Sequence, residues 1–279
     1  MGAAKQLIAV IILLALLFVR TAHVEAQAPG KLKIGNNLTV SELGVWRTIH
    51  KGVEFRTIVV ERGEPKYQME LKLVRFDSKL ITVKILASSD FSLKSASAKT
   101  FVEKSGVLAA INANYFDEKG RPLAYLKTLN HEINRSVSKH GLYTGVFAVR
   151  DGAPVIIHRD EFQPAQAGEA LQSGPLLLNR GTPVETMRGL GRYARRAFVG
   201  IDKDGRTIVG VTDAVLGGLS FAELQELFVI PKAQLEISDL LNLDGGGSAQ
   251  LHIKAGKFEE SVLGTTEVPV AIGFFSKSN

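Results

Sequence analysis

Residues 52–87 restrict the fold of this chain most, because polar and apolar side chains alternate along them. Residues 67–76 read YQMELKLVRF, in which every second residue from the tyrosine to the second leucine is apolar. A period of two is typical of a strand with one buried face. Residues 52–62 and 80–87 have a similar pattern, so three consecutive strands joined by turns are expected here.

Several further stretches combine apolar and β-branched residues and are expected to form strands. They are residues 107–111, 146–149, 155–157, 197–201, 207–211, 240–243 and 268–275. Asp151-Gly152 and Asp204-Gly205 each separate two of these stretches and predict hairpin turns. The uninterrupted apolar run at 107–111 favours a strand that is covered on both faces.

Helices are indicated by residues typical of helix ends. Residues 95–104 are rich in serine and alanine and are followed by Gly106, a common residue after a helix C-terminus. Ser220 and Glu223 match a capping box, and apolar residues recur at helical spacing until Pro231. Many strands with two or three helices in mixed order predict an α+β fold, with a strand-rich mixed sheet core in a single compact domain.

Composition excludes several kinds of chemistry. The 279 residues include no cysteine, so disulfides, thiolate catalysis and cysteine-ligated zinc are impossible. With 45% hydrophobic residues, the chain can form a core without such staples. The formal net charge is +6, but no block of five or six like charges is present, so a nucleic-acid partner is not expected.

The N-terminus has the features of an export signal. Lys5 precedes a 13-residue apolar run from Leu7 to Val19, and small residues precede a cleavage position after Ala26. A run this short does not span a bilayer, so no stable membrane insertion is expected after signal removal. We expect residues 1–26 to be a signal peptide of a secreted or periplasmic protein, residues 27–106 a β-rich part of its domain, and residues 107–279 the core.

A glycine-rich run stands out near the C-terminus. Residues 242–250 read NLDGGGSAQ and follow the apolar Leu240 and Leu241. A carboxylate and three glycines after a strand let the backbone approach a ligand and present amides to an anion. From the residues alone, a glycine hairpin loop explains the run equally well. Ser248 has no support as a hydrolase nucleophile, because Gln250 stands where the G-x-S-x-G motif needs glycine.

Several short blocks occur in an order that resembles the phosphodiester glycosidase family. The blocks are NANYFD at 112–117, SGP at 173–175, RAFVGID at 196–202, Asp213, GLS at 218–220 before Glu223, and DGGGS at 244–248. The resemblance extends over residues 107–275. It implies hydrolysis of a sugar that is joined through its anomeric carbon to a phosphate diester, in a family that includes secreted bacterial members.

The chemistry of such a reaction suggests a role for each candidate residue. Asp213 and Asp244 are the expected acid/base pair, since each follows a β-rich apolar run, and Glu223 is a third catalytic candidate. Arg196 is the expected phosphate clamp, because a guanidinium matches two phosphate oxygens. The substrate-binding candidates are Asn112, Arg196, Gly245, Gly246, Gly247 and Ser248.

Each role has a structural alternative. Asp213 could cap a turn or a helix start, and Asn112 could bind backbone groups at a strand end. Arg196 could be a solvated surface residue beside two neighbouring arginines. For Glu223 the structural alternative is favoured, because the capping box already gives its carboxylate a partner.

The predicted reaction requires no cofactor. The histidines lack the spacings of common metal motifs, although a divalent cation held by Asp213 and Asp244 is compatible with the sequence. Residues 189–194 match G-x-G-x-x-A without a preceding strand, which argues against a dinucleotide site. The polar segment 130–141 is expected to be a loop, from which His131 and His140 could reach a functional cleft.

The sequence therefore predicts a secreted hydrolase of sugar 1-phosphodiesters, with a glycan or sugar-phosphate substrate. The alternative is a cell-envelope polysaccharide-binding module with the same fold and no catalysis. This alternative is motivated by Ala197 and Ala214, which stand at positions that are usually polar or glycine in the family.

Overall fold

Three strands occupy residues 52–87 in the computed structural model: β4 (Val53–Arg62), β5 (Tyr67–Phe76) and β6 (Ile81–Ala87). The structure describes residues 32–34, 37–63, 67–129, 131–185 and 192–277. β4 and β5 pair antiparallel along their whole length, from Val53–Phe76 to Arg62–Tyr67. β6 leaves this sheet and pairs with a C-terminal strand instead. The predicted strands are therefore confirmed, but they belong to two sheets.

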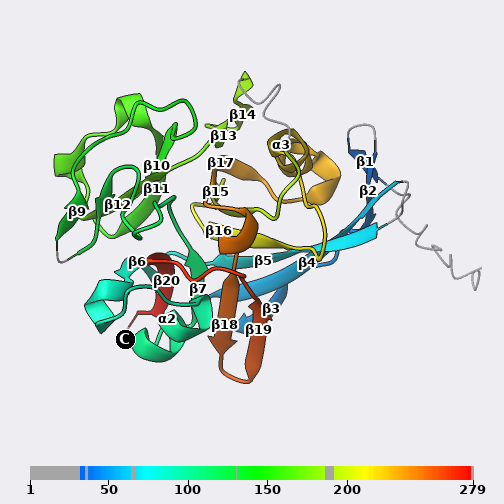
Figure 1. Ribbon diagram of the computed structural model, residues 1–279. Coiled ribbons are helices and arrows are strands. Elements are labelled where there is room, and N and C mark those ends of the chain that lie inside the picture. Colours follow the sequence, from blue (N-terminus) through cyan, green and yellow to red (C-terminus); the bar gives the residue numbers. More distant parts are fainter. Residues whose placement is uncertain (1–31, 35–36, 64–66, 130, 186–191, 278–279) are drawn as a thin grey trace, which may run out of the picture. The chain divides into compact units, whose positions relative to one another are not determined.

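The described strands form three sheets (Figure 1). The first sheet has ten strands, with β3 (Arg47–His50) paired to β4 at its side. In spatial order the others are β1 (Leu32–Ile34), β2 (Leu38–Glu42), β4, β5, β16 (Thr207–Asp213), β15 (Ala197–Asp202), β17 (Ile237–Asn242), β13 (Leu176–Asn179) and β14 (Thr182–Pro183).

The other two sheets have five strands each. In the second sheet the order is β11 (Ala153–His158), β10 (Gly145–Arg150), β12 (Glu169–Ser173), β8 (Leu126–Lys127) and β9 (Glu132–Asn134). In the third sheet it is β19 (Phe258–Val262), β18 (Leu251–Ala255), β7 (Ala109–Asn112), β20 (Val270–Ser276) and β6. Within the polar segment, residues 131–141 thus contain the short strand β9 and are otherwise a loop.

Two α-helices lie in the described ranges, α2 (Ala98–Ser105) and α3 (Phe221–Val229). Gly106 ends α2 in the left-handed region, at φ 71°, as its position predicts. The Ser220–Glu223 capping box at the start of α3 is confirmed by both of its hydrogen bonds. The fold is strand-rich as expected, but it is mostly β rather than an even mixture. Neither helix is long and apolar enough to cross a membrane.

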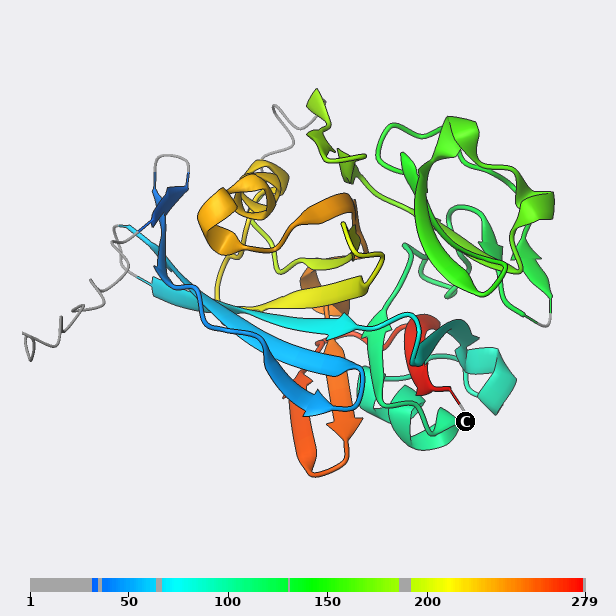
Figure 2. The same cartoon turned by 180° about the vertical axis from the view of Figure 1, so that it is seen from behind.

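One hydrophobic core joins the three sheets. Phe76 of β5 stacks on Phe274 of β20, with 3.8 Å between ring centroids, and this contact fastens the first sheet to the third. Phe147 and Leu171 of the second sheet are fully buried in the same cluster. Figure 2 shows β4 and β5 (blue to cyan) beside the β18–β19 hairpin (orange), where Phe55 packs on Phe258. Residues 33–279 form one compact unit.

Besides the turn from β5 to β6, three connections carry the described chain from one sheet to another. Residues 113–125 lead from β7 in the third sheet to β8 in the second, residues 174–175 from β12 to β13 in the first, and residues 243–250 from β17 back to β18 in the third. We call these the three crossovers. They contain nearly all of three of the six motif blocks, those at 112–117, 173–175 and 244–248, so the fold brings these three blocks to the junction of the sheets. The expected signal peptide, residues 1–26, lies outside the described residues.

Candidate active site

The three crossovers are tied together by one tyrosine and one asparagine. The Tyr115 hydroxyl donates to the carbonyl oxygen of Gly174 at 3.0 Å. The Asn242 side-chain amide donates to the same carbonyl at 2.9 Å and to the Tyr115 hydroxyl at 3.0 Å. Because Asn242 is fully buried and precedes Asp244 by two residues, this network fixes the position of the carboxylate.

Asp244 has a perturbed carboxyl group at this junction. Burial raises its pKa from an ordinary 3.8 to about 6, although the Ser248 hydroxyl and the Gly245 amide hydrogen-bond the carboxylate and oppose this rise. The negative charge of Asp244 in turn contributes to raised pKa values of Tyr115 and Tyr143, after the larger effect of burial. A partly buried carboxyl group that changes protonation near pH 6 is suited to general acid–base catalysis.

Asn112 lies beneath the glycine-rich crossover. Its side-chain amide donates to the Asp244 carbonyl at 2.7 Å, and its side-chain oxygen accepts from the Gln250 amide at 3.0 Å. The residue has no exposed surface. The structure therefore gives Asn112 the backbone-binding role that was its structural alternative, at both ends of residues 244–250.

The glycine run is not a hairpin loop, because it joins strands of different sheets. Residues 246–248 form a 3₁₀ turn in which the Ser248 amide donates to Gly245 at 3.2 Å. The Gly246 amide donates to the Arg195 carbonyl at 2.8 Å. Gly245 is required sterically, since a Cβ there would lie 2.7 Å from that carbonyl oxygen. Two of the amides expected to bind an anion are thus occupied by backbone oxygens.

Arg196 is buried rather than solvated, which excludes its surface alternative. Its Nε donates to the Leu219 carbonyl at 2.7 Å, and another nitrogen, Nη2, donates to the Arg192 carbonyl. The guanidinium stacks on the Phe221 ring, 3.8 Å from the centroid. Nη1 has no hydrogen-bond partner among the described residues and lies 3.9 Å from the position of a Cβ on Gly245. One nitrogen is therefore available beside the glycine run.

Asp213 forms an ion pair with Lys72, a residue with no hydrogen bond or ion pair to Asp244 among the described residues. At the end of β16 it lies 3.4 Å from Lys72, which also contacts Glu260 at 2.9 Å and Glu70 at 3.8 Å. Burial lowers the pKa of Arg195, and the negative charge of Asp213 acts in the opposite direction. Within the described ranges, no hydrogen bond or ion pair joins Asp213 to Asp244 or to Arg196. Asp213 is neither a turn cap nor a helix cap.

Both carboxylate oxygens of Glu223 accept hydrogen bonds from other residues. Its two oxygens accept from Arg62 at 2.8 Å each, and one of them also accepts from the Ser220 amide at 2.9 Å. Burial would raise the pKa of Glu223, but these hydrogen bonds and the charge of Arg62 hold it below its usual value. An ionised carboxylate that is engaged in this way resembles a structural group more than a proton carrier.

The structure thus brings Asn112, Arg196, Asp244 and Ser248 to the crossovers and leaves Asp213 and Glu223 with separate partners. It adds Tyr115, Asn242 and Arg195 to the set. Tyr115 lies in the block at 112–117, and Asn242 lies in the glycine-rich run at 242–250. The sequence could therefore have indicated both residues. Nothing local marked Arg195, whose Nη2 donates to the carbonyls of Ala249 and Leu263.

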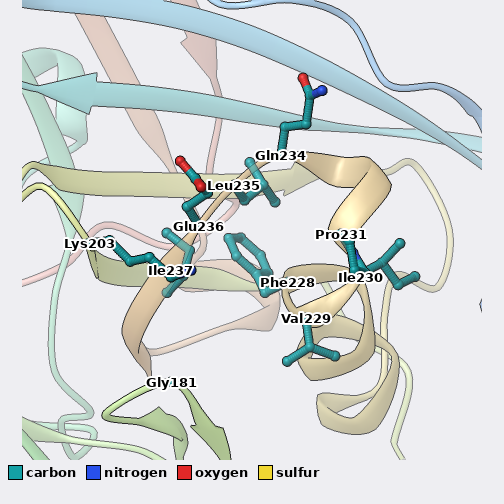
Figure 3. Close-up of a pocket in the computed structure, with 10 residues that line it drawn as sticks. All are labelled: Gly181, Lys203, Phe228, Val229, Ile230, Pro231, Gln234, Leu235, Glu236 and Ile237. Atoms are coloured by element: carbon teal, nitrogen blue, oxygen red, sulfur yellow. The ribbon is translucent and has the colours of Figure 1, made fainter.

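A separate pocket of about 650 Å³ lies beside α3 and the start of β17 (Figure 3). Its walls combine apolar residues such as Phe228, Leu235 and Ile237 with the charged Lys203 and Glu236. It contains none of the predicted site residues. In the described parts of the chain, no three acidic or histidine side chains are placed to hold a metal ion together.

Comparisons with known proteins identify the family of this chain. Residues 105–275 match the family model of the phosphodiester glycosidases, which covers more than half of the chain. The chain therefore belongs to the phosphodiester glycosidase family. No sequence among curated proteins matches it.

Solved structures share the fold at low sequence identity. The zebrafish N-acetylglucosamine-1-phosphodiester alpha-N-acetylglucosaminidase catalytic domain, auto-inhibited by its pro-peptide, has a TM-score of 0.64 at 13% identity, over 86% of this chain and 88% of that one. A hypothetical protein from Synechocystis has a TM-score of 0.59 at 15% identity, over 86% and 65%. A Burkholderia pseudomallei protein described as exported has a TM-score of 0.53 at 11% identity, over 75% and 74%.

Proposed function

We propose that this protein hydrolyses sugars that are joined through their anomeric carbon to a phosphate diester. The observation that carries the proposal is the carboxyl group of Asp244, with a pKa of about 6, at the junction of the three crossovers in a chain of the phosphodiester glycosidase family. A carboxylate of this kind can activate a water molecule or stabilise positive charge at an anomeric carbon.

Asp244 and Arg196 have different roles in the proposed reaction. Near neutral pH, Asp244 is mostly ionised and accepts a proton from the attacking water. The free Nη1 of Arg196 donates to a phosphate oxygen beside Gly245, so that negative charge on the leaving phosphate has a partner. Because the phosphate monoester released when the anomeric C–O bond breaks is a good leaving group, this arrangement needs less acid assistance than hydrolysis of an ordinary glycoside does.

Asp213 has a supporting role in the same proposal. Its contact with Lys72 and the effect of its charge on Arg195 support this role. Arg195 in turn holds that run through its own carbonyl and through Ala249. We assign the reacting carboxylate to Asp244 and the positioning of Arg195 to Asp213.

The proposal is tested with a panel of sugar 1-phosphodiesters that differ in sugar and in alcohol. Purified protein lacking residues 1–26 is expected to release sugar from at least one of them. In ¹⁸O-labelled water, the label is expected in the sugar, because attack occurs at the anomeric carbon. Release of no sugar from any compound, with tight binding of a glycan by calorimetry, would instead identify a polysaccharide-binding module.

The rate is expected to depend on the protonation of Asp244. Since the ionised form is the active base, kcat/KM should be constant above pH 7 and fall about tenfold per pH unit well below pH 6. A profile measured from pH 4.5 to 8.5 checks this expectation. A maximum below pH 5 would contradict the assignment of Asp244 as a base.

We also propose that the protein is exported. The apolar run after Lys5 and the small residues before Ala26 support this, and one protein of the same fold is described as exported. Mass spectrometry of the secreted or periplasmic fraction should find a mature N-terminus at Gln27. A cytoplasmic protein that retains residues 1–26 would refute the proposal.

A further inference from the structure

Two tyrosines and a histidine form a row of aromatic rings beside Asp244. Tyr115 and Tyr143 have ring centroids 5.4 Å apart, and His140 and Tyr143 have centroids 5.3 Å apart. The planes are tilted by 43° and 41°, respectively. We call Tyr115, Tyr143 and His140 the aromatic ledge. His140 is exposed and both tyrosines are partly exposed, so the ledge is not part of the hydrophobic core.

The inner end of the ledge is hydrogen-bonded to groups that lie close to Asp244 in the fold. The Tyr115 hydroxyl is bound to Gly174 and Asn242, and Asn242 is two residues from Asp244. The Tyr143 hydroxyl has no hydrogen-bond partner among the described residues. Burial and the charge of Asp244 raise its pKa, so it stays protonated and can donate a hydrogen bond.

The outer end of the ledge is held by the second sheet. Gln172 of β12 is fully buried. Its side-chain amide donates to the carbonyl oxygens of Ser138 and Tyr143, in each case at 2.8 Å. Leu142 lies directly against Gly174, where a Cβ would be 1.9 Å from the Leu142 carbonyl oxygen. The loop that carries Tyr143 and His140 is therefore attached through its backbone, while His140 Nδ1 accepts from the Leu142 amide at 3.2 Å.

The ledge and Arg196 approach Asp244 from different sheets. Arg196 directly precedes β15 of the first sheet and is anchored at Leu219 and Phe221. Tyr143 and His140 belong to the loop before β10 of the second sheet. The charges of Asp244 and Arg196 both act on the Tyr115 hydroxyl, so a substrate held between these two residues lies against the inner end of the ledge.

We propose that the aromatic ledge is the sugar subsite, and that the Tyr143 ring stacks on the C–H face of a pyranose while its hydroxyl donates to a sugar hydroxyl. This inference rests on the proposed function and names the residues that select the sugar. Aromatic faces with a polar tip are well suited to a ring that is apolar on its face and polar at its rim. Tyr143 is then the residue that distinguishes one sugar from another, and His140 extends the surface.

Variants at two positions separate stacking from the hydroxyl. Tyr143→Ala should raise KM about tenfold while kcat changes less than about threefold, since a stacked ring contributes of order 1 kcal/mol. Tyr143→Phe keeps the ring, so its KM should rise only for sugars that have a hydroxyl in reach of Tyr143. His140→Ala should have a smaller effect of the same kind. His131→Ala, an exposed histidine in the same polar segment, is the matched control and should change nothing.

Two simple ligands give a readout that does not need turnover. Calorimetry with a methyl glycoside of the preferred sugar should show about tenfold weaker binding to Tyr143→Ala, whereas the affinity for inorganic phosphate should stay the same. Equal weakening of both ligands, or an unchanged glycoside affinity, would overturn the inference. Thermal unfolding of each variant checks that the fold is kept, which the backbone attachment of the loop favours.

Failure of the proposed function remains distinguishable from failure of the ledge. If the wild-type protein hydrolyses no diester but binds a methyl glycoside through Tyr143, the function is wrong and the sugar subsite stands. If it hydrolyses a diester with the same KM in wild type and Tyr143→Ala, the function stands and the ledge is wrong. If the wild type binds none of the methyl glycosides, the ledge is also wrong.

Discussion

Asp244→Asn is expected to lower kcat/KM by about 10²–10⁴-fold, because asparagine cannot accept the proton of the attacking water. The substitution keeps the size of the side chain and an oxygen that can accept from Ser248 and Gly245. The remaining geometry, including the Asn112 contact to the Asp244 backbone, is therefore preserved. Steady-state kinetics on the best diester of the panel measure the loss, and an unchanged rate would remove Asp244 from the mechanism.

The same substitution is expected to stabilise the protein at neutral pH. Because the pKa of Asp244 is raised in the folded state, its protonated form favours folding below about pH 4, and this stability is lost as the pH rises through about 6. Asparagine does not ionise, so the Asp244→Asn variant does not lose stability in this way. The advantage of Asp244→Asn over the wild type should therefore grow between pH 4 and pH 7, by about 2–3 kcal/mol.

Urea unfolding at several pH values between 4 and 8 measures this difference. Asp151→Asn is a suitable control, since Asp151 is exposed in the β10–β11 turn at φ 48°, a conformation that asparagine also adopts readily. Its free energy of unfolding should follow the wild-type curve. Gain of stability with loss of activity at Asp244 alone would show that the protein maintains an unfavourable ionised carboxylate for function.

The elements of this fold that were predictable are those with a local cause. Alternation identified the strand at 67–76, and the Ser220–Glu223 pair identified the start of α3, because each signal is contained within a few neighbouring residues. The assignment of strands to sheets was not predictable in this way. β5 pairs with β16, about 130 residues later, and no local pattern specifies a partner at that distance.

The residues of the candidate site differ in the same way: some are indicated by a local pattern, and others are brought together only in the folded chain. The block at 244–248 was visible because three glycines after a carboxylate are unusual in any local structure. The burial of Arg196 was not, since its partners are two carbonyl oxygens and the Phe221 face, which only the folded chain supplies. Tyr143 follows the polar segment 130–141, and its position near Asp244 depends on contacts such as the Gln172 hydrogen bond, which only the folded chain supplies.

Glu223→Gln is expected to destabilise the protein by about 2–4 kcal/mol, because it removes the negative partner of a buried arginine. The side chains of Arg62 and Glu223 are only 10% and 12% exposed. Arg62 is also held on the Tyr193 ring at 4.0 Å and donates to Gly218, so it cannot easily turn to solvent. Because the pKa of Glu223 is lowered on folding, the stability it provides is present above about pH 4.5 and is lost as the pH falls through its folded value.

Glu161→Gln is the matched control for this loss. Glu161 pairs with Arg180 at 2.6 Å, but the two side chains are 48% and 74% exposed, so the change should cost less than about 1 kcal/mol. Urea unfolding at pH 7.5 compares the two variants, and kcat measured well below the unfolding temperature separates stability from chemistry. If Glu223 is structural, kcat is retained while the free energy of unfolding falls. A hundredfold loss of kcat with little loss of stability would instead return Glu223 to the catalytic residues, with Arg62 as the group that keeps it ionised.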